Sequence, residues 1–303
     1  MKVLVFGSLN IDYVYSVEHF VKPGETISST DRKIFCGGKG LNQAIAFARY
    51  GQETWQAGAV GTGDSQMLLD MLQKSAVHTE LIAKKDGPSG HTIIQRTPQG
   101  ENNIILFGGA NQTISKEDVD KVLDKFEKGD YLILQNEINQ IPYIMEEAYK
   151  KGMHIVLNPS PMDAKIFEMP LEYVDYLILN EIEAAAILEA KDVKIGENPT
   201  GEWLLDRLLE TFPDSKIVLT LGGDGSMYGD KKKRCRQGIV SVRVVDTTAA
   251  GDTFTGYFMG EIMNGKLPED ALKTAATAAA MAVSKAGAGP SIPGYEEVSA
   301  WNA

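Results

Sequence analysis

The sequence has few of the features that mark secreted, membrane or nucleic-acid-binding proteins. Only two of its 303 residues are cysteine, Cys36 and Cys235, which are too few and too far apart to suggest a disulfide framework or a zinc site. No stretch approaches the ~18 apolar residues of a membrane span. Lysine and arginine total 30 against 41 aspartates and glutamates, so no overall basic field is present to attract nucleic acid or an anionic membrane. These shortages predict a protein of the reducing cytoplasm that has neither nucleic acid nor a membrane as a partner.

One dense basic run remains, KKKRCR at residues 231–236. It lies between GSMYG and GIVSVRVV, which both have the composition of strands. A nucleic-acid patch is one interpretation of such a run. A solvated hairpin turn is favoured, because short charge runs usually lie on exposed surface.

Short apolar runs alternate with longer amphipathic stretches along the chain. Buried strands are predicted for KVLVFGS, which is too short for a signal peptide, and for TWQAGAVG, DYLILQNE, HIVLNPS, VDYLILNE and SKIVLTLGG. Helices are predicted for GLNQAIAFARYG, QIPYIMEEAYKKG and TGEWLLDRLLETF, with Gly51, Gly152 and Thr200 as end signals. A further helix is expected to start at LPED and to continue through an alanine-rich stretch. This alternation predicts one α/β domain, residues 1–303, with a mostly parallel sheet flanked by helices on both faces.

Two segments interrupt the alternation. Residues 11–35 and 88–107 are rich in β-branched and aromatic residues and contain the turn signals KPGE and PQGEN. Each segment is expected to form an antiparallel hairpin. Together they could form a small sheet that covers the ligand crevice as a lid, and two ordinary surface hairpins are the alternative.

The stretch VVDTTAAGDTFTG, residues 244–256, joins a predicted strand to a helix that begins at or near Asp252. Its small side chains leave the backbone accessible, and the free amides at a helix start can hold a phosphoryl group. A carboxylate at the same place can accept a proton from an attacking hydroxyl. An isolated aspartate at a helix start is more often an N-cap, so this motif alone favours the structural interpretation.

Four other motifs lie where strands of such a sheet would end, the place where open α/β sheets bind ligands. CGGKGLNQA, residues 36–44, permits close backbone approach but is not a Walker loop, because no serine or threonine follows its lysine. GSLNID, LNEIEAA and TLGGDGS begin at residues 7, 179 and 220. Each of the four, taken alone, also fits an ordinary turn or helix entry.

Taken together and in order, these motifs resemble the ribokinase-like (PfkB) sugar kinases over almost the whole chain. The forms GGKG.NQA and AAGDTF.G are the most specific parts of the resemblance. It implies ATP-dependent phosphorylation of a sugar hydroxymethyl group, with D-ribose, giving ribose 5-phosphate, as the first candidate. Deoxyribose, another sugar or a nucleoside is the alternative. A non-catalytic sugar or nucleotide sensor would belong to a different class, and the retained Asp252 argues against it.

The resemblance also implies roles for individual residues at the acceptor side. Asp252 is expected to be the general base, and the amides of Ala249, Ala250 and Gly251 are expected to form an anion hole. The positions that match sugar contacts are Asn10, Asp12, Gly38, Lys39, Asn42, Glu137 and Asp252.

On the nucleotide side the resemblance implies ATP with Mg²⁺, and K⁺ near the anion hole. Glu183 matches the acidic residue that acts indirectly on magnesium, and two lids are expected to join in a homodimer. The positions that match ATP contacts are Asn180, Glu183, Thr220, Gly222, Gly225 and Gly251, and those that match the potassium site are Asp246, Thr248, Ala282, Lys285, Gly287 and Ser291.

A few residues depart from the family pattern. Asn136 precedes Glu137, Leu41 stands where alanine is frequent, and His91 lies on a lid strand from which it could reach the sugar or face solvent. Cys36, beside a glycine, could be open to oxidation, although burial as a small hydrophobic residue is favoured. These departures concern the choice of sugar and leave the chemistry unchanged.

Overall fold

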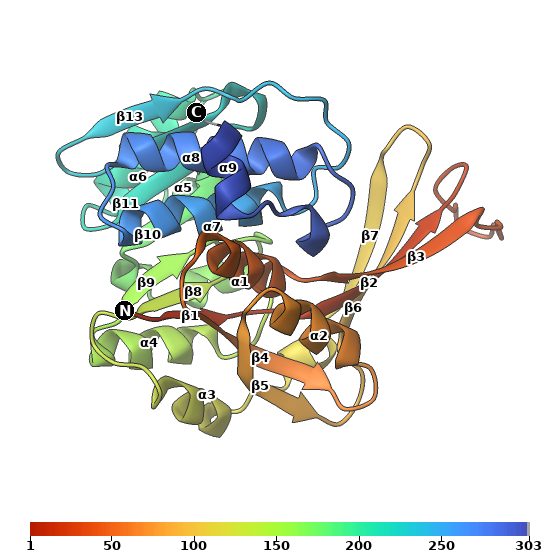
Figure 1. Ribbon diagram of the computed structural model, residues 1–303. Helices are drawn as coiled ribbons and strands as arrows, with labels where there is room; N and C mark the ends of the chain where they lie inside the picture. Colours follow the sequence, from red (N-terminus) through yellow and green to blue (C-terminus); the bar gives the residue numbers. More distant parts are fainter. Residues whose placement is uncertain (302–303) are drawn as a thin grey trace.

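The computed structural model describes residues 1–301 and contains one large sheet (Figure 1). Its strands are β1 (Val3–Phe6), β4 (Thr54–Gly61), β5 (His78–Lys85), β8 (Tyr131–Leu134), β9 (His154–Leu157), β10 (Tyr176–Asn180), β11 (Lys216–Thr220), β12 (Ser226–Gly229) and β13 (Arg234–Gln237). They are ordered β13-β12-β11-β10-β9-β8-β1-β4-β5. Neighbouring strands from β11 to β5 are parallel, whereas β12 and β13 are antiparallel. The predicted α/β fold with a mostly parallel sheet is confirmed.

Helices cover both faces, because successive residues of a buried strand point to opposite sides. In β1, Val3 and Val5 contribute to one core, and Leu4 and Phe6 contribute to the other. The first core is covered by α1 (Lys39–Tyr50), α2 (Gln66–Lys74), α7 (Ala250–Met263), α8 (Pro268–Val283) and α9 (Tyr295–Trp301). The second is covered by α3 (Lys116–Leu123), α4 (Ile141–Lys151), α5 (Glu181–Ala190) and α6 (Gly201–Thr211).

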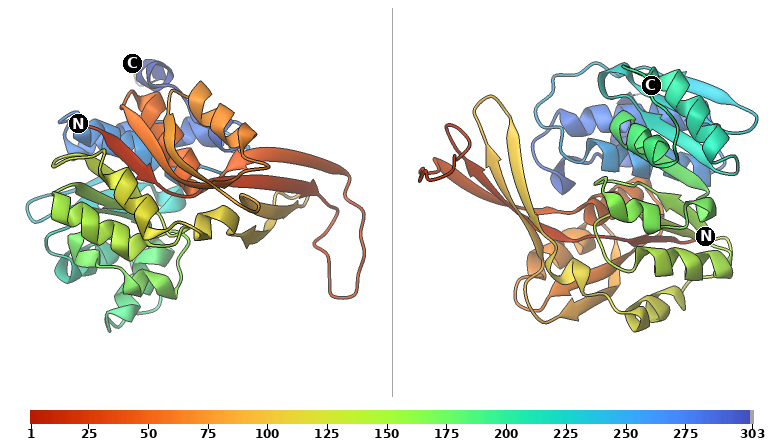
Figure 2. Two further views of the ribbon diagram at one scale, coloured as in Figure 1. Left: turned by 90° about the horizontal axis from the view of Figure 1, so that it is seen from below. Right: turned by 180° about the vertical axis from the view of Figure 1, so that it is seen from behind.

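The lid is a separate sheet of β2 (Asn10–Ser16), β3 (Asp31–Gly37), β6 (Gly90–Arg96) and β7 (Asn102–Phe107), in the order β3-β2-β6-β7. It projects from one edge of the body (Figure 2). The two predicted hairpins, β2/β3 and β6/β7, are antiparallel as expected. A parallel pairing of β2 with β6 joins them into one sheet.

Helices α1 and α7 pack unusually closely, and this contact determines the geometry of the site. A Cβ at Gly256 of α7 would lie 2.4 Å from the Cβ of Ala46, and one at Gly260 would lie 2.4 Å from the Tyr50 ring. Because both positions are glycine, the two backbones can approach each other. The first turn of α1 is thereby placed beside the first turn of α7.

The predicted strand over residues 238–246 is wrong. β13 ends at Gln237, and the chain then crosses α8 without a strand partner. The amides of Val245 and Asp246 instead donate to the carbonyl of Val283 in α8. The composition suits a strand, but no sheet edge is available beside this segment.

The basic run 231–236 is the turn and returning strand of the β12/β13 hairpin, as the favoured interpretation predicted. Acidic residues of neighbouring elements pair with four of its five cations. The pairs are Lys231 with Asp214, Lys233 with Glu269, Arg234 with Asp206 and Arg236 with Glu202. Within residues 1–301, no helix combines the length and apolar character needed to cross a membrane.

Candidate active site

Two adjoining cavities lie at the carboxyl ends of β10 and β11. The larger has a volume of about 550 Å³ and the smaller about 190 Å³. Both are lined by Asn180, Thr220, Thr247, Ala250 and Gly251, so they communicate along this row of residues. Their position agrees with the general rule for ligand sites in open α/β sheets.

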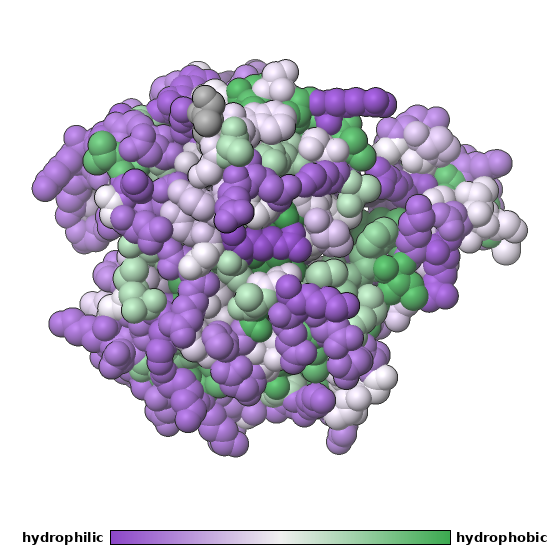
Figure 3. Space-filling model, viewed as in Figure 1, coloured by the Kyte–Doolittle hydropathy of each residue, from purple (hydrophilic) through white to green (hydrophobic). Residues whose placement is uncertain are grey.

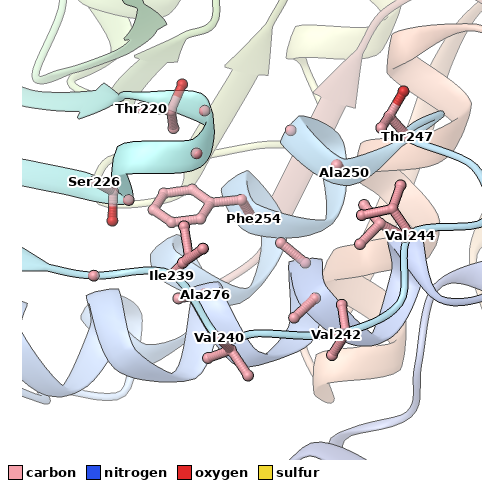
Figure 4. A pocket seen from close by; sticks show the side chains of 18 of the residues that line it. Thr220, Ser226, Ile239, Val240, Val242, Val244, Thr247, Ala250, Phe254 and Ala276 are labelled. Atoms are coloured by element: carbon pink, nitrogen blue, oxygen red, sulfur yellow. The ribbon is translucent and has the colours of Figure 1, made fainter.

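The larger cavity has mainly apolar walls (Figure 4). Ile239 lies beside the Phe254 ring, and alternate valines of the unpaired segment, Val240, Val242 and Val244, turn toward the same space. Helix α8 contributes small side chains there, which leave room for a ligand. Its lining residues are Ala276, Ala279, Ala280 and Val283.

Glycines at the β11 exit serve two different purposes. Gly222 has φ 52° and open space where a side chain would be, so a ligand can approach its backbone. Gly225 has φ 94°, and a Cβ there would lie 2.1 Å from the carbonyl oxygen of Gln237. Glycine at position 225 is therefore required by the β12/β13 hairpin, although the residue also lines the larger cavity.

The smaller cavity contains the charged groups Lys39, Glu183 and Asp252. Glu183 is buried and forms a capping box: its Oε2 accepts the amide of Asn180 at 3.0 Å, and Asn180 Oδ1 accepts the amide of Glu183 at 2.9 Å. Glu183 is thus a helix-entry carboxylate, which is the ordinary structural interpretation that the LNEIEAA motif also fits. Its position on the cavity wall also leaves it available to a metal-bound ligand.

Asp252 does not cap its own helix. The N-cap of α7 is Ala249, in the left-handed region at φ 61°, and no side chain caps this end. The Asp252 carboxylate is 6% exposed and points to α1, where Asn42 Nδ2 donates to Oδ2 at 3.0 Å and Gln43 Nε2 donates to Oδ1 at 3.0 Å. The N-cap interpretation of Asp252 is therefore wrong.

The backbone before Asp252 has the form expected of an anion site. First-turn amides of a helix lack intrahelical acceptors. The amide of Ala250 makes only a long 3.3 Å bond to the carbonyl of Thr247, and Gly251 has open space where a side chain would be. These amides line both cavities and can donate to an anion beside Asp252.

A second polar group lies between the body and the lid, around Asn10, Asp12 and Glu137. Asn10 is 2% exposed and accepts from Asn111 Nδ2 at 2.7 Å, while Thr92 Oγ1 donates to Asp12 Oδ1 at 2.6 Å. Burial raises the pKa of Asp12 to about 6; the Thr92 bond lowers it less, and the charge of Glu137 raises it further. Polar side chains of the kind that recognise a molecule with many hydroxyl groups thus gather near the base of the lid.

The α1 entry connects the two polar groups. Glu137 Oε2 accepts the amide of Lys39 at 3.0 Å and also the Ser8 hydroxyl. Asn42 donates to Asp252, yet its own Oδ1 is buried without a hydrogen-bond partner among the described residues. A buried acceptor of this kind is expected to receive a donor from a ligand.

Comparison with known proteins agrees with this geometry. The model of the pfkB family of carbohydrate kinases matches residues 1–294. The chain belongs to this kinase family. A ribokinase of Staphylococcus aureus is 34% identical to the kinase over 307 residues, covering 98% of both chains.

Solved structures extend the likeness to the fold. The crystal structure of a Thermotoga maritima ribokinase has a TM-score of 0.86 and 34% identity, covering 99% of both chains. An Arabidopsis thaliana ribokinase, solved in complex with ribose and ATP, has a TM-score of 0.85 and 28% identity, covering 99% of this chain and 97% of that one.

Around the expected potassium site the kinase brings together only some of the named residues. Asp246 Oδ1 accepts from the amide and hydroxyl of Thr248 at 3.0 and 2.6 Å, and its Oδ2 accepts the amide of Gly287 at 3.3 Å. Although burial raises the pKa of Asp246, these bonds and the nearby Arg96 bring it below its usual value. Three expected residues have other contacts: the Ala282 carbonyl accepts the Lys285 amide, Lys285 Nζ approaches Glu297, and the Ser291 hydroxyl donates to the Ala288 carbonyl.

The residues that depart from the family pattern mostly make contacts within the fold. Asn136 faces away from Glu137 and donates to the carbonyl of Pro161 and to Asp163. His91 is paired with Ile11, on the opposite face of the lid from Asp12, and its ring contacts Tyr13 and Phe107. Leu41 is completely buried, and Cys36 is 5% exposed as the favoured interpretation predicted.

Sequence reasoning missed four polar residues of the site: Ser8, Gln43, Thr92 and Asn111. Gln43 lies within GGKGLNQA, so its motif was the one available signal. Thr92 reaches the site because β6 pairs with β2. Asn111 reaches it through its hydrogen bonds with Leu9 and Asn10. Nothing near them in the sequence marks such long-range contacts.

Proposed function

We propose that this kinase transfers the γ-phosphoryl group of ATP to the terminal hydroxymethyl group of D-ribose, forming ribose 5-phosphate and ADP. The observation that carries the proposal is the position of Asp252. Its carboxylate adjoins the amides that begin α7, and it is bonded to Asn42 and Gln43 at the α1 entry. Family membership and the Arabidopsis relative bound to ribose and ATP support the choice of ligands.

The acceptor sugar is assigned to the polar group beneath the lid. Asn10, Asp12 and Glu137 supply acceptors and donors for its hydroxyls, together with Asn42 and Lys39. Asp252 accepts the proton of the attacking hydroxyl as the oxygen bonds to phosphorus and the bond to the ADP oxygen breaks. The lid excludes water, which would otherwise compete with the sugar as acceptor.

The nucleotide is assigned to the larger cavity. Its volume of about 550 Å³ and its apolar walls suit an adenosine group, and the amides of Ala250 and Gly251 suit the phosphates. The carboxyl ends of β10 and β11 contribute Asn180, Thr220, Gly222 and Gly225 to this nucleotide site. Glu183 fits an indirect role toward magnesium, an ion that proteins usually bind through one or two carboxylates plus substrate phosphates. Bound there, the ion would neutralise phosphate charge.

For potassium, we assign as ligands the carboxylate of Asp246, which accepts from Thr248 and Gly287, and the backbone of Thr248. The carbonyls of Ala282, Lys285, Gly287 and Ser291 are assigned as further ligands. We place the kinase in the cytoplasm, where ATP and ribose are both accessible.

An ADP-release assay over pentoses, hexoses and nucleosides, with and without potassium, tests the proposal. Ribose is expected to be the best acceptor. Asp252→Ala is expected to lose roughly 10²-fold or more of its turnover while still binding ribose, since general-base contributions are of this size. A nucleoside that outperforms every free sugar would refute the ribose assignment, and the absence of ADP release with every acceptor would refute the kinase.

We also propose that two subunits pair through their lids. The edge strand β7 exposes four consecutive large apolar residues, Ile104, Ile105, Leu106 and Phe107, at 55%, 61%, 46% and 51%. Figure 3 shows apolar surface where the lid leaves the body. Both faces of such a strand require cover, one by the sugar site and the other by a second lid.

Sedimentation velocity tests the pairing. Ile105→Asp is expected to convert a dimer into a monomer, because it places a charge on the apolar outer face of the lid. Glu101→Asp, which retains the charge of an exposed residue in the β6/β7 turn, is the control. A monomeric wild-type protein at micromolar concentration would contradict the proposal.

A further inference from the structure

Behind the candidate base lies a glutamine that no part of the proposed reaction uses. Gln43 is completely buried in α1 and does not line either cavity described above. Its side chain nevertheless bonds directly to Asp252 Oδ1 at 3.0 Å. It therefore contacts the carboxylate from within the protein, outside the lining of both cavities.

Three partners determine the orientation of the Gln43 amide. Nε2 donates to Asp252 and, at 3.3 Å, to Asn158 Oδ1, while Oε1 accepts from Gln135 Nε2 at 2.7 Å. Asn158 is oriented by its own bond to the backbone carbonyl of Ile178, at 2.9 Å. Because a backbone carbonyl can only accept, Asn158 must present its oxygen to Gln43, and Gln43 must present its nitrogen to Asp252.

We propose that Gln43, oriented by Gln135 and Asn158, is a positioning residue that keeps the Asp252 carboxylate directed at the acceptor hydroxyl. This inference rests on the proposed function, in which Asp252 is the base. Asn42 holds Oδ2 and Gln43 holds Oδ1, so the carboxylate plane is fixed at both oxygens. An amide N–H in this position makes a charge-assisted hydrogen bond to the carboxylate, which an apolar side chain cannot make.

Gln43→Met tests the proposal with little change in volume. The variant is expected to lose about 10-fold or more in kcat, since a hydrogen bond to a charged group is removed, while the KM for ribose changes little. Lys39 and Glu183, the other charged groups of the smaller cavity, are unchanged in this variant. A loss of kcat at unchanged KM would therefore point to the orientation of Asp252.

Gln56→Met is the matched control. Gln56 is also completely buried, and its Nε2 donates to the carbonyls of Gly7 and Ala57, away from Asp252. This variant is expected to lose stability in thermal unfolding while it retains the wild-type kcat at a temperature where it is folded. Gln135→Met removes only the orienting bond, so a smaller loss of kcat is expected, and it serves if Gln43→Met does not fold.

The outcomes separate the two proposals. If wild-type protein phosphorylates ribose and Gln43→Met has the same kcat, the role of Gln43 is refuted and the proposed function stands. An equal loss of kcat in Gln56→Met would also refute it, since the effect would then come from any buried amide. A wild-type protein that releases no ADP with any acceptor would refute both the proposed function and the role of Gln43.

Discussion

Asp12→Asn is expected to make the kinase more stable and a poorer binder of sugar. Burial beneath the lid raises the pKa of Asp12 from 3.8 to about 6, with Glu137 adding to the increase, and the hydrogen bond from Thr92 offsets only part of it. A carboxyl group whose pKa is higher in the folded chain than in the unfolded chain opposes folding once it is ionised. Asparagine removes the charge and keeps an oxygen that can accept from Thr92.

The magnitude follows from the pKa. One pKa unit corresponds to about 1.4 kcal/mol, so the change from 3.8 to about 6 sets an upper limit of about 3 kcal/mol. Because Asp12 is partly exposed, solvent screening reduces the expected gain to about 1–2 kcal/mol. The gain should be complete above pH about 6, shrink between pH about 6 and 4, and disappear below the unfolded-state value, where the carboxyl group is neutral in both states.

Urea unfolding of both proteins between pH about 4 and 8 measures this profile. Asp31→Asn, at an exposed position on β3, is the control and should leave the free energy of unfolding nearly unchanged. Ribose binding by the variant should weaken by ~10-fold or more, because a charge-assisted acceptor is lost. A variant that is no more stable than wild type above pH about 6, or whose gain persists at pH about 4, would refute the argument.

Two further changes test the lid and the α1 entry. Gly38→Ala is expected to lower stability and activity together, because its φ is 95° and an added Cβ would lie 2.8 Å from a backbone oxygen. Gly24→Ala, at φ 79° in open space, should have a smaller effect on thermal unfolding. Arg96→Gln is expected to raise the KM for ribose by a few-fold, since Arg96 Nη1 on β6 lies 3.6 Å from Asp246 Oδ2 and links the lid to the body. Unchanged ribose kinetics in Arg96→Gln, or equal effects of the two glycine substitutions, would contradict these expectations.

Much of the framework could be predicted from local sequence patterns. Runs such as VLVF form buried strands because each residue has an apolar neighbour on one face of the sheet or the other. Thr200 and Gly51 mark helix ends because capping depends on the residue itself and the adjacent backbone. The half-exposed strand β5, HTELIAKK, was not predicted because its apolar residues are sparse. The segment 238–246 was misassigned because its composition says nothing about whether a neighbouring strand exists.

The site was predictable where a motif contains its own partners and not where the partners come from distant segments. Asp252 and Asn42 were identified through their motifs, yet 210 positions separate them, and only the packing of α1 on α7 brings them together. Thr92 and Asn111 reach the sugar site through contacts 80 and 101 positions away. Such contacts depend on topology, which local periodicity does not contain.

The environment of Asp252 also departs from the local rule for its position. Aspartate near a helix start normally bonds to the amides of its own helix, which would occupy the amides that an incoming phosphoryl group needs. Here the left-handed Ala249 takes the N-cap position, and two amides of α1 hold the carboxylate instead. These two hydrogen bonds fix the carboxylate in place without using the amides of α7. The arrangement therefore leaves both the helix amides and the carboxylate available for the same reaction.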